Sequence, residues 1–238
     1  HWRELIERYE PRILWNDIGY PGGGDLPALF ADYYNGCPDG LVNDRFSVVD
    51  LGPRGSLRRR ILLPLLSRLA QWMMKRGSTS APSGMPADFR TPEYAVYQQA
   101  AAKKWEATRG LGLSFGWNQA EGEEHYLPAE KLVHTFIDVV SKGGNLLLNV
   151  GPDAAGRIPA PQSSRLEALG AWMMVNGEGI YATHPWTRAE GTSADGQPLR
   201  FTSRNGQVYV FLLAQPPGAV LRLPGLAPQP GSPMRLLG

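Results

Sequence analysis

Residues 128–150, PAEKLVHTFIDVVSKGGNLLLNV, place a helix signal directly before a strand signal. Pro128 suits the first position of a helix, and Gly143 and Gly144 suit its end. The apolar run over 145–150 is typical of a buried strand. A helix followed at once by such a strand is the repeating unit of a parallel α/β fold. The apolar residues of the helix recur at helical spacing, at Leu132, Val133, Phe136, Ile137 and Val140.

Strand and helix signals of the same kind precede residue 128 and follow residue 150. Apolar runs that end in polar residues alternate with segments of helical spacing. They give about four βα units, whereas a closed (β/α)8 barrel needs eight units and about 250 residues. We therefore predict an α/β fold, the second half of a TIM-like barrel over residues 1–186, with the first half upstream. In chain order, we expect a helix over 1–9, a strand over 13–17, a helix over 25–36, strands over 41–46 and 110–115, and a helix over 161–176.

From about residue 187 the sequence predicts strands alone. Two apolar segments, 199–202 and 207–213, flank residues 204–206, RNG, which form a strong hairpin signal. The chain then becomes rich in proline and glycine. We expect residues 187–238 to form part of a small antiparallel β domain, a partial C-terminal β-sandwich.

The composition excludes several classes of protein. Of 238 residues, 24 are Lys or Arg and 22 are Asp or Glu, and seven of the basic residues fall in the acid-free segment 54–76. That segment has one tryptophan, Trp72, among leucines, whereas nucleic-acid binding favours charges that are interleaved with aromatic residues or spread over one face of the fold. The only cysteine, Cys37, excludes an internal disulfide and a thiolate metal site. The longest apolar run, 61–66, is far shorter than the roughly 20 residues that span a bilayer.

Polar residues follow the predicted strands, where a parallel α/β fold carries its chemistry. Asp17, Arg45 and Asn149 lie at the carboxyl ends of their strands. Each alone is ordinarily a loop cap or a turn residue. Trp15 lies two residues before Asp17 and shares its strand face, which puts an aromatic ring beside a carboxylate. An apolar wall beside a carboxylate is typical of a sugar site.

Seven short motifs make a family resemblance specific. They are LWND at 14–17, VNDR at 42–45, TPEY at 91–94, WEATR at 105–109, LSFG at 113–116, SKGGNLLLNVGP at 141–152 and VNGEGIY at 175–181. In this order, across residues 1 to about 215, they resemble the α-L-fucosidases of glycoside hydrolase family 29. The resemblance covers the second half of that family's catalytic barrel and the start of its C-terminal β domain.

The resemblance implies a retaining exo-glycosidase that releases terminal α-L-fucose through a covalent fucosyl-enzyme and needs no cofactor. Asp17 corresponds to the family's nucleophile. Glu93 corresponds to the bacterial type of acid/base residue, which protonates the leaving oxygen and then activates water. In a retaining enzyme the two carboxyl groups lie about 5–5.5 Å apart. Glu106 is the alternative acid/base residue, for which a structural role in the barrel is the simpler interpretation.

Three further residues correspond to substrate-binding positions. Arg45 matches a sugar-binding arginine, whose donors can hold ring hydroxyls and favour an ionised carboxylate nearby. Trp15 and Phe115 match the apolar wall that receives the C6 methyl group of fucose, and core packing is the alternative role for Phe115. We expect no metal site, because no metal-ligand spacing involves the histidines at His125, His134 and His184.

An insertion at about residues 50–88 is the main departure from the family pattern. On a helical wheel, residues 57–75 show a basic and polar strip opposite a wide apolar face. The simpler interpretation is a helix that packs on the barrel. The alternative is a helix over residues 57–76 that contacts an anionic membrane surface or a partner. Residues 77–84, GSTSAPSG, are typical of a flexible linker.

Two functions follow from these observations. The first is an α-L-fucosidase that acts on fucosylated glycans, periplasmic or extracellular as the resemblance implies, of which this chain is an incomplete part. The second is a non-catalytic fucose-binding or membrane-docked remnant. Because the family's pocket also draws groups from the first half of the barrel, we expect residues 1–238 alone to hydrolyse fucosides poorly or not at all. Open strand edges predict a homo-oligomer unless the missing half completes the barrel.

Overall fold

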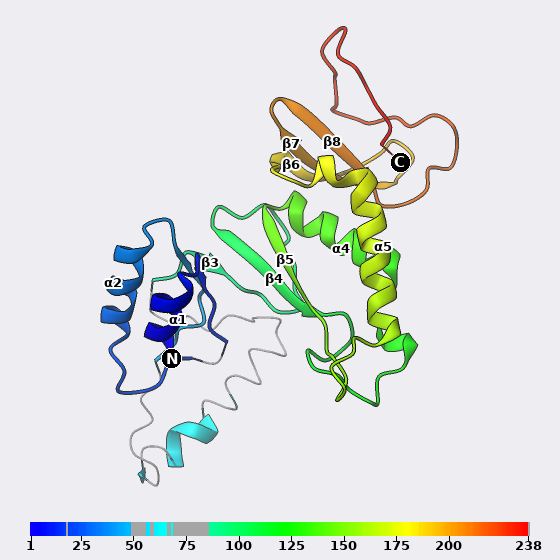
Figure 1. Ribbon diagram of the computed structural model, residues 1–238. Helices are drawn as coiled ribbons and strands as arrows, with labels where there is room; N and C mark the ends of the chain where they lie inside the picture. The colour runs from blue at the N-terminus through cyan, green and yellow to red at the C-terminus, as the bar shows by residue number, and fades with distance from the viewer. Residues whose placement is uncertain (18, 49–55, 58–59, 66–67, 69–85, 238) are drawn as a thin grey trace. The chain divides into compact units, whose positions relative to one another are not determined.

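The computed structural model describes residues 1–17, 19–48, 56–57, 60–65, 68 and 86–237 (Figure 1). The chain divides into two units. The first unit comprises residues 1–95 and 103–106, and the second comprises residues 96–102 and 107–238.

The first unit contains alternating helices and short parallel strands. β1 pairs with β2 in parallel, and β3 pairs with β4 in parallel. A parallel bridge between Asn43 and Phe89 joins the end of β2 to β3. Each strand therefore lies beside the next one along the chain, as in a parallel barrel. The elements are α1 (Trp2–Tyr9), β1 (Ile13–Leu14), α2 (Leu26–Gly36), β2 (Leu41–Val42), β3 (Phe89–Arg90) and the start of β4 (Lys104–Gly110).

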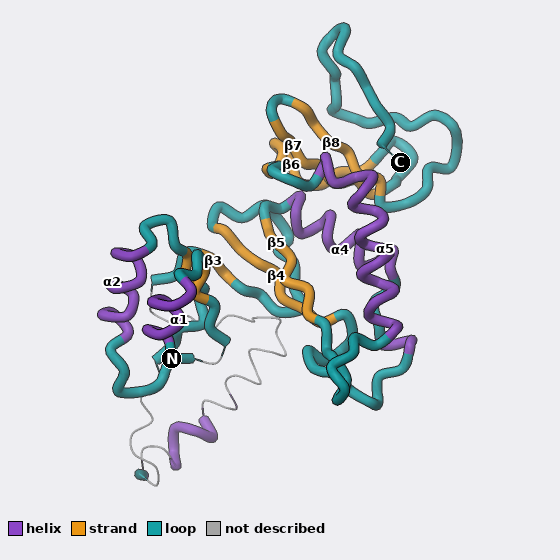
Figure 2. Tube along the Cα trace, in the orientation of Figure 1, coloured by secondary structure: helices purple, strands orange, loops and turns teal. Residues whose placement is uncertain are grey.

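Helix α2 confirms the helix expected over 25–36 and carries the core of the first unit. Asp25 caps it by accepting a 2.9 Å hydrogen bond from the backbone N–H of Ala28. Phe30 of α2 meets Phe46 edge to face, with ring centroids 5.2 Å apart. Helix α1 lies beside α2 and packs against the same cluster (Figure 2). The buried members of this cluster are Leu14, Leu26, Leu29, Phe30, Tyr33, Val42 and Phe46.

Asp88 fastens β3 to β2 where the described chain resumes. Its Oδ2 accepts 2.7 Å hydrogen bonds from the Tyr34 hydroxyl and from the Val42 backbone N–H. Its own backbone N–H donates to the Val42 carbonyl at 2.9 Å. Burial, together with the Asp88 carboxylate, raises the pKa of the Tyr34 phenol, so this hydroxyl remains a donor.

The second unit continues β4 and adds α4 (Ala129–Ser141), β5 (Gly144–Asn149) and α5 (Ala160–Asn176). β5 lies beside β4, and α4 packs against both β5 and α5 (Figure 2). Gly143 turns the chain from α4 into β5 with a φ of 79°. Two 3-10 helices, η1 (Glu123–His125) and η2 (Gly177–Gly179), complete the unit's helical elements in the described chain. Leu111, Tyr126 and Leu132 form one buried cluster of this unit, with Leu146, Leu148 and Leu169 packed against them.

The C-terminal sheet is antiparallel and has the order β6 (His184–Thr192), β7 (Pro198–Arg204), β8 (Gln207–Leu212). Asn205 and Gly206 join β7 to β8 with φ values of 51° and 78°, which a two-residue type I′ turn requires. Arg204 pairs with Gln207 directly across this turn. The hairpin that residues 204–206 predict is therefore confirmed.

Charged side chains fasten this sheet to α4. The Lys142 ammonium lies 2.9 Å from the Asp138 carboxylate and 3.6 Å from that of Glu190 on β6. Arg200 of β7 pairs with the same two carboxylates. The Lys142 side chain is only 5% exposed, so its charge is balanced within the protein. This network holds β6 and β7 against the end of α4.

The strand expected over residues 110–115 is wrong. The strand is β4, at Lys104–Gly110, and the chain bends over 111–116. Charged residues at Glu106 and Arg109 obscure its apolar alternation in the sequence. β5 is also less buried than expected, with Leu147 at 44% exposure.

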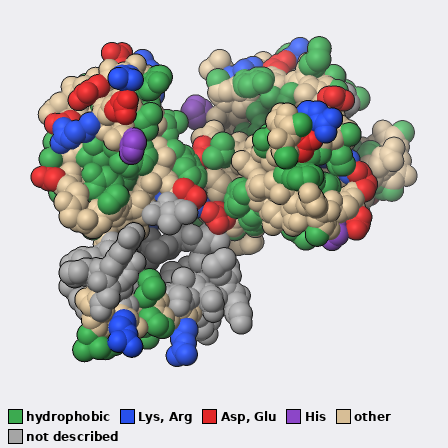
Figure 3. All heavy atoms as spheres, turned by 60° about the horizontal axis from the view of Figure 1, so that its bottom comes forward, with side chains coloured by type: hydrophobic (Ala, Val, Ile, Leu, Met, Phe, Trp, Pro, Cys, Tyr) green, Lys and Arg blue, Asp and Glu red, His purple; other side chains and the backbone are tan. Residues whose placement is uncertain are grey.

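Most of the helix expected over 57–76 lies outside the described residues, as does the linker over 77–84. Residues 60–65 are helical. Figure 3 shows apolar and basic side chains at the surface of the described part of this segment, where Leu57, Ile61, Leu63 and Leu65 are all exposed. Within the described chain, no helix is both long enough and apolar enough to cross a bilayer. Membrane contact, the linker and the domain boundary at 187 stay predictions, although β6 already begins at His184.

Candidate active site

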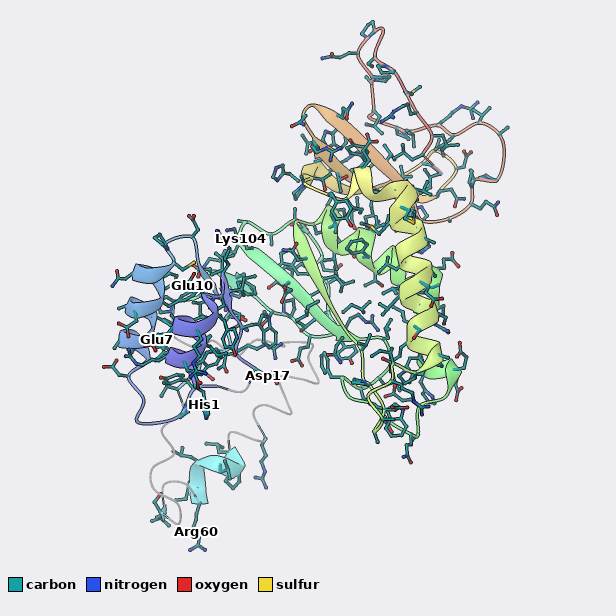
Figure 4. All side chains as sticks on the ribbon, in the orientation of Figure 1. His1, Glu7, Glu10, Asp17, Arg60 and Lys104 are labelled. Carbon is teal, nitrogen blue, oxygen red and sulfur yellow. The ribbon has the colours of Figure 1, made fainter. Side chains whose placement is uncertain are left out.

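Three parallel strands of the first unit end in polar residues that contact one another. Asp17 lies on the loop after β1 (Figure 4), Arg45 follows β2, and Thr91 and Glu93 follow β3. The carboxyl ends of parallel strands meet at one edge of a sheet, and this brings the side chains together.

Two buried asparagines shape the turns that carry Asp17 and Arg45. The Asn43 side chain accepts a 3.0 Å hydrogen bond from the Asn16 backbone N–H and donates one of 2.8 Å to the Asn16 carbonyl. The Asn16 side chain donates to the carbonyls of Gly19, at 2.6 Å, and Arg45, at 3.1 Å. The buried backbone polar groups of these turns are thereby satisfied. The segment that presents Asp17 is tied to the one that presents Arg45.

Arg45 is the centre of the site. Its Nη1 donates a 3.0 Å hydrogen bond to Oδ1 of Asp17 and a short one to Oε1 of Glu93. The Arg45 side chain is 14% exposed, so water screens its positive charge only partly. One nitrogen therefore contacts both carboxylates.

Thr91 and Trp15 hold the guanidinium of Arg45 in place. Its Nε donates to the Thr91 hydroxyl at 2.8 Å, and its Nη2 donates to the Thr91 carbonyl at 2.9 Å. Its Cζ lies 5.1 Å from the centroid of the Trp15 ring, within the range of a cation–π interaction. These contacts fix both the plane and the direction of the fork.

Asp44 lies behind Thr91 and is fully buried, with 0% of its side chain exposed. Its Oδ1 accepts hydrogen bonds from the Thr91 hydroxyl at 2.7 Å and from the Thr91 backbone N–H at 3.1 Å. Arg90 approaches the other oxygen at 3.5 Å. A buried carboxylate needs such donors, because its desolvation is otherwise costly.

Glu106 of β4 contacts the Trp15 ring. The indole Nε1 donates a 2.8 Å hydrogen bond to Oε1 of Glu106. This bond fixes the plane of the ring beneath the Arg45 guanidinium. It gives Glu106 a contact with the ring beside Arg45, and the choice between its two interpretations stays a prediction.

The two carboxylates beside Arg45 have different surroundings. The Asp17 side chain is 62% exposed and the Glu93 side chain is 34% exposed. Carboxylates in unlike environments can take different roles in one reaction. In the described part of the chain, no group of three or more His, Cys, Asp or Glu residues could hold a metal ion.

Phe115 and Asn149 belong to the second unit. The Asn149 amide donates to the carbonyl of Phe115 and, at 3.3 Å, to that of Val150. Such bonds fit the loop-cap role expected of a residue at a strand end. Phe115 is 38% exposed and is no ordinary core residue, and its sugar-binding role stays a prediction.

The first unit therefore brings together four of the five predicted site residues, Trp15, Asp17, Arg45 and Glu93. Asp44 and Thr91 have supporting roles that the sequence patterns did not indicate. Both lie inside the motifs VNDR and TPEY, and the signal that could have found them is a polar residue next to a strand end.

Known proteins resemble this chain over most of its length. A family model described as alpha-L-fucosidase matches residues 1–178. The chain is 29% identical over 246 residues to the plasma α-L-fucosidase of Pongo abelii, a match that covers 99% of this chain and 44% of that protein. It is 38% identical over 120 residues to the α-L-fucosidase of Dictyostelium discoideum, covering 50% of this chain and 26% of the relative. The chain thus spans under half the length of these curated relatives.

Solved structures give the same result. The α-fucosidase of Thermotoga maritima, in complex with a mechanism based inhibitor, matches with a TM-score of 0.71 and 42% identity. The match covers 91% of this chain and 42% of that chain. Another structure of the same protein, in complex with fucose, matches with a TM-score of 0.69 and 41% identity over 91% of this chain and 42% of that one.

Proposed function

Because the chain belongs to the α-L-fucosidase family, we propose that Asp17 and Glu93 are the catalytic carboxylates of a retaining fucosidase. In this proposal, the parallel strands of this chain correspond to the second half of the family's TIM barrel. The antiparallel sheet corresponds to the start of the family's β domain. The substrate is a terminal α-L-fucoside on a glycan.

The contact that carries this proposal is the donor shared by the two carboxylates. Asp17 and Glu93 each have an oxygen in hydrogen-bond contact with the same Nη1 of Arg45. Those two oxygens can be no farther apart than two hydrogen-bond lengths, roughly 6 Å. Retaining glycosidases need about 5–5.5 Å between their carboxyl groups, and inverting ones need about 6.5–9.5 Å. The bound is compatible with the separation that a retaining enzyme needs.

Two displacements at the anomeric carbon complete the reaction. In the first, an Asp17 oxygen bonds to C1 while the glycosidic C1–O bond breaks and Glu93 gives its proton to the leaving oxygen. In the second, Glu93 takes a proton from water, the water oxygen bonds to C1, and the ester bond to Asp17 breaks. The cycle ends with Asp17 ionised and Glu93 protonated, as it began.

The neighbouring residues suit the sugar. Arg45 stabilises the charge that returns to Asp17 and offers donors to a ring hydroxyl. Trp15 presents an apolar ring, and we assign it to the C6 methyl group of fucose. The Glu106 contact keeps that ring in one orientation.

Hydrolysis of an aryl α-L-fucoside tests the proposal. The assay compares this chain with the longest product of its gene, each with and without Asp17→Asn. Asp32→Asn is the matched control, because Asp32 is an exposed residue of α2 that pairs with Arg3 outside the site. We expect little or no turnover by residues 1–238, turnover by the longer product, and a loss of about 10³-fold or more with Asp17→Asn.

The other outcomes have definite meanings. A longer product without activity that still binds L-fucose would favour the non-catalytic remnant. Turnover unaffected by Asp17→Asn would reject Asp17 as the nucleophile. Release of β-L-fucose as the first product, seen by NMR, would reject the retaining mechanism.

A further inference from the structure

We propose that Thr91, oriented by the buried carboxylate of Asp44, is a positioning residue that aims Arg45 at both Asp17 and Glu93. The inference rests on the proposed function for the significance of those carboxylates. The side chains of Thr91, Asp44 and Arg45 all lie in the described part of the first unit.

The anchor is Asp44. Its side chain is fully buried, and one oxygen, Oδ1, accepts from both the hydroxyl and the backbone N–H of Thr91. These two bonds fix the Thr91 side chain and main chain together at the end of β3. A buried carboxylate without them would carry a large desolvation cost, so the arrangement is strongly favoured.

The direction of the Thr91 proton matters most. A threonine hydroxyl has one proton to donate and lone pairs to accept with. Because the proton goes to Asp44, the lone pairs face the Nε of Arg45, 2.8 Å away. Asp44 therefore makes Thr91 a pure acceptor toward Arg45.

Two acceptors on one residue then set the whole fork. The Thr91 hydroxyl binds Nε and the Thr91 carbonyl binds Nη2. A planar guanidinium held at two of its nitrogens has no freedom left at the third. Nη1 is that third nitrogen, and it is the one that contacts Asp17 and Glu93.

The pair Thr91→Val and Thr91→Ser separates this role from packing. Valine keeps the shape and the carbonyl but removes the acceptor for Nε and a donor to Asp44. Serine keeps the hydroxyl and loses only a methyl group. If the valine variant does not fold, Thr91→Ala takes its place.

The first measurement is the ¹⁵N–¹H NMR signal of the Arg45 Nε–H, which needs no activity. We expect this proton to be protected from exchange in the unsubstituted chain and in Thr91→Ser, and to exchange faster in Thr91→Val. Equal protection in all three would overturn the proposal, whatever the activity of the chain.

The second measurement is the hydrolysis of an aryl α-L-fucoside by the longest product of the gene. Loss of a hydrogen bond to a charged group predicts a fall in kcat of about 10- to 100-fold in Thr91→Val, with less change in KM and near-complete rescue in Thr91→Ser. A merely structural role would lower the temperature of unfolding and leave kcat of the folded enzyme unchanged. That result would overturn the positioning role, whereas an inactive unsubstituted enzyme counts against the proposed function and leaves the exchange measurement to decide the inference.

Discussion

The Trp15 indole donates a 2.8 Å hydrogen bond to Glu106, and this contact joins residues 91 positions apart in the chain. It connects the end of β1 to β4, on either side of the strands that carry Arg45 and Glu93. The ring thus has one edge bound to a carboxylate and one face beneath a guanidinium. These two contacts hold the ring in one orientation.

Replacement of Glu106 tests this support. Glu106→Ala leaves the partly buried indole N–H without its acceptor, and we expect the free energy of unfolding to fall by about 1–2 kcal/mol. Glu106→Gln keeps an acceptor oxygen and is expected to cost less than about 1 kcal/mol. Urea unfolding followed by tryptophan fluorescence measures both. Equal losses in the two variants would mean that the hydrogen bond does not support the ring.

Replacement of Glu93 tests its assignment as the acid/base residue against Glu106. In the longest product of the gene, Glu93→Gln is expected to slow hydrolysis of fucosides with poor leaving groups by about 10²–10⁴-fold. Activated aryl fucosides need little proton transfer to the leaving oxygen, so their first displacement is expected to slow much less. Pre-steady-state release of the aryl group measures that step. Glu106→Gln is the matched control. If only Glu106→Gln slows the fucosides with poor leaving groups and spares the activated ones, Glu106 is the acid/base residue.

A close approach at Gly151 predicts opposite effects for two glycine substitutions in the second unit. A Cβ at Gly151 would overlap the backbone of Gly116 and Trp117, whereas a Cβ at Gly170, in α5, meets nothing within 4 Å. Gln162 also holds Gly151, accepting from its N–H at 2.8 Å and donating to its carbonyl at 3.3 Å. Gly151→Ala is therefore expected to destabilise by about 1–3 kcal/mol, and Gly170→Ala to stabilise by about 0.5–1 kcal/mol.

Thermal or urea unfolding of the two alanine variants checks this pair. Both add one methyl group and remove one glycine from the unfolded chain, so the difference between them reports the close contact at Gly151 and the helix propensity of alanine at position 170. Similar effects of the two substitutions would show that the loop of Gly116 and Trp117 moves aside without cost.

Local patterns in the sequence predict the helices and the hairpin because their causes are local. Apolar spacing and the Asp25 cap define α2, and positive φ at Asn205 and Gly206 defines the turn between β7 and β8. The sequence did not predict β4, because the charged residue Glu106 lies among its buried positions. Glu106 is accommodated there by a hydrogen bond from Trp15, which only the fold brings close. Residues that break a local rule in this way are expected near functional sites.

In the site, too, the sequence predicts the features that have local causes and misses those that depend on tertiary contacts. The polar residue after each strand predicts Asp17 and Arg45, because strand ends of a parallel fold converge. The chain from Asp44 to Thr91 to Arg45 could not be predicted, since it depends on which hydroxyl lone pair faces which donor across 46 or 47 residues. The direction of such hydrogen bonds follows from tertiary geometry and cannot be inferred from the spacing of residues in the sequence.

His134 of α4 predicts a pH dependence of stability. Burial lowers the pKa of its imidazole below the ordinary 6.5, with Glu130 opposing the shift and Lys131 and Arg200 adding to it. In the unfolded chain the pKa is higher, so between the two values the unfolded state binds more protons and stability rises with pH. The contribution of His134 is fully present above about pH 7 and is lost as the pH falls through the lower, folded value.

His134→Gln removes this titration. We expect the urea midpoint of the unsubstituted chain to fall more between pH 7.5 and pH 5 than the urea midpoint of the variant. The two midpoints therefore differ more at pH 7.5 than at pH 5. His184→Gln, at an exposed histidine at the start of β6, controls for the loss of a histidine in the same unit. Because the neutral imidazole is the form that folding favours, a steeper loss of stability in acid for His134→Gln would contradict the assignment.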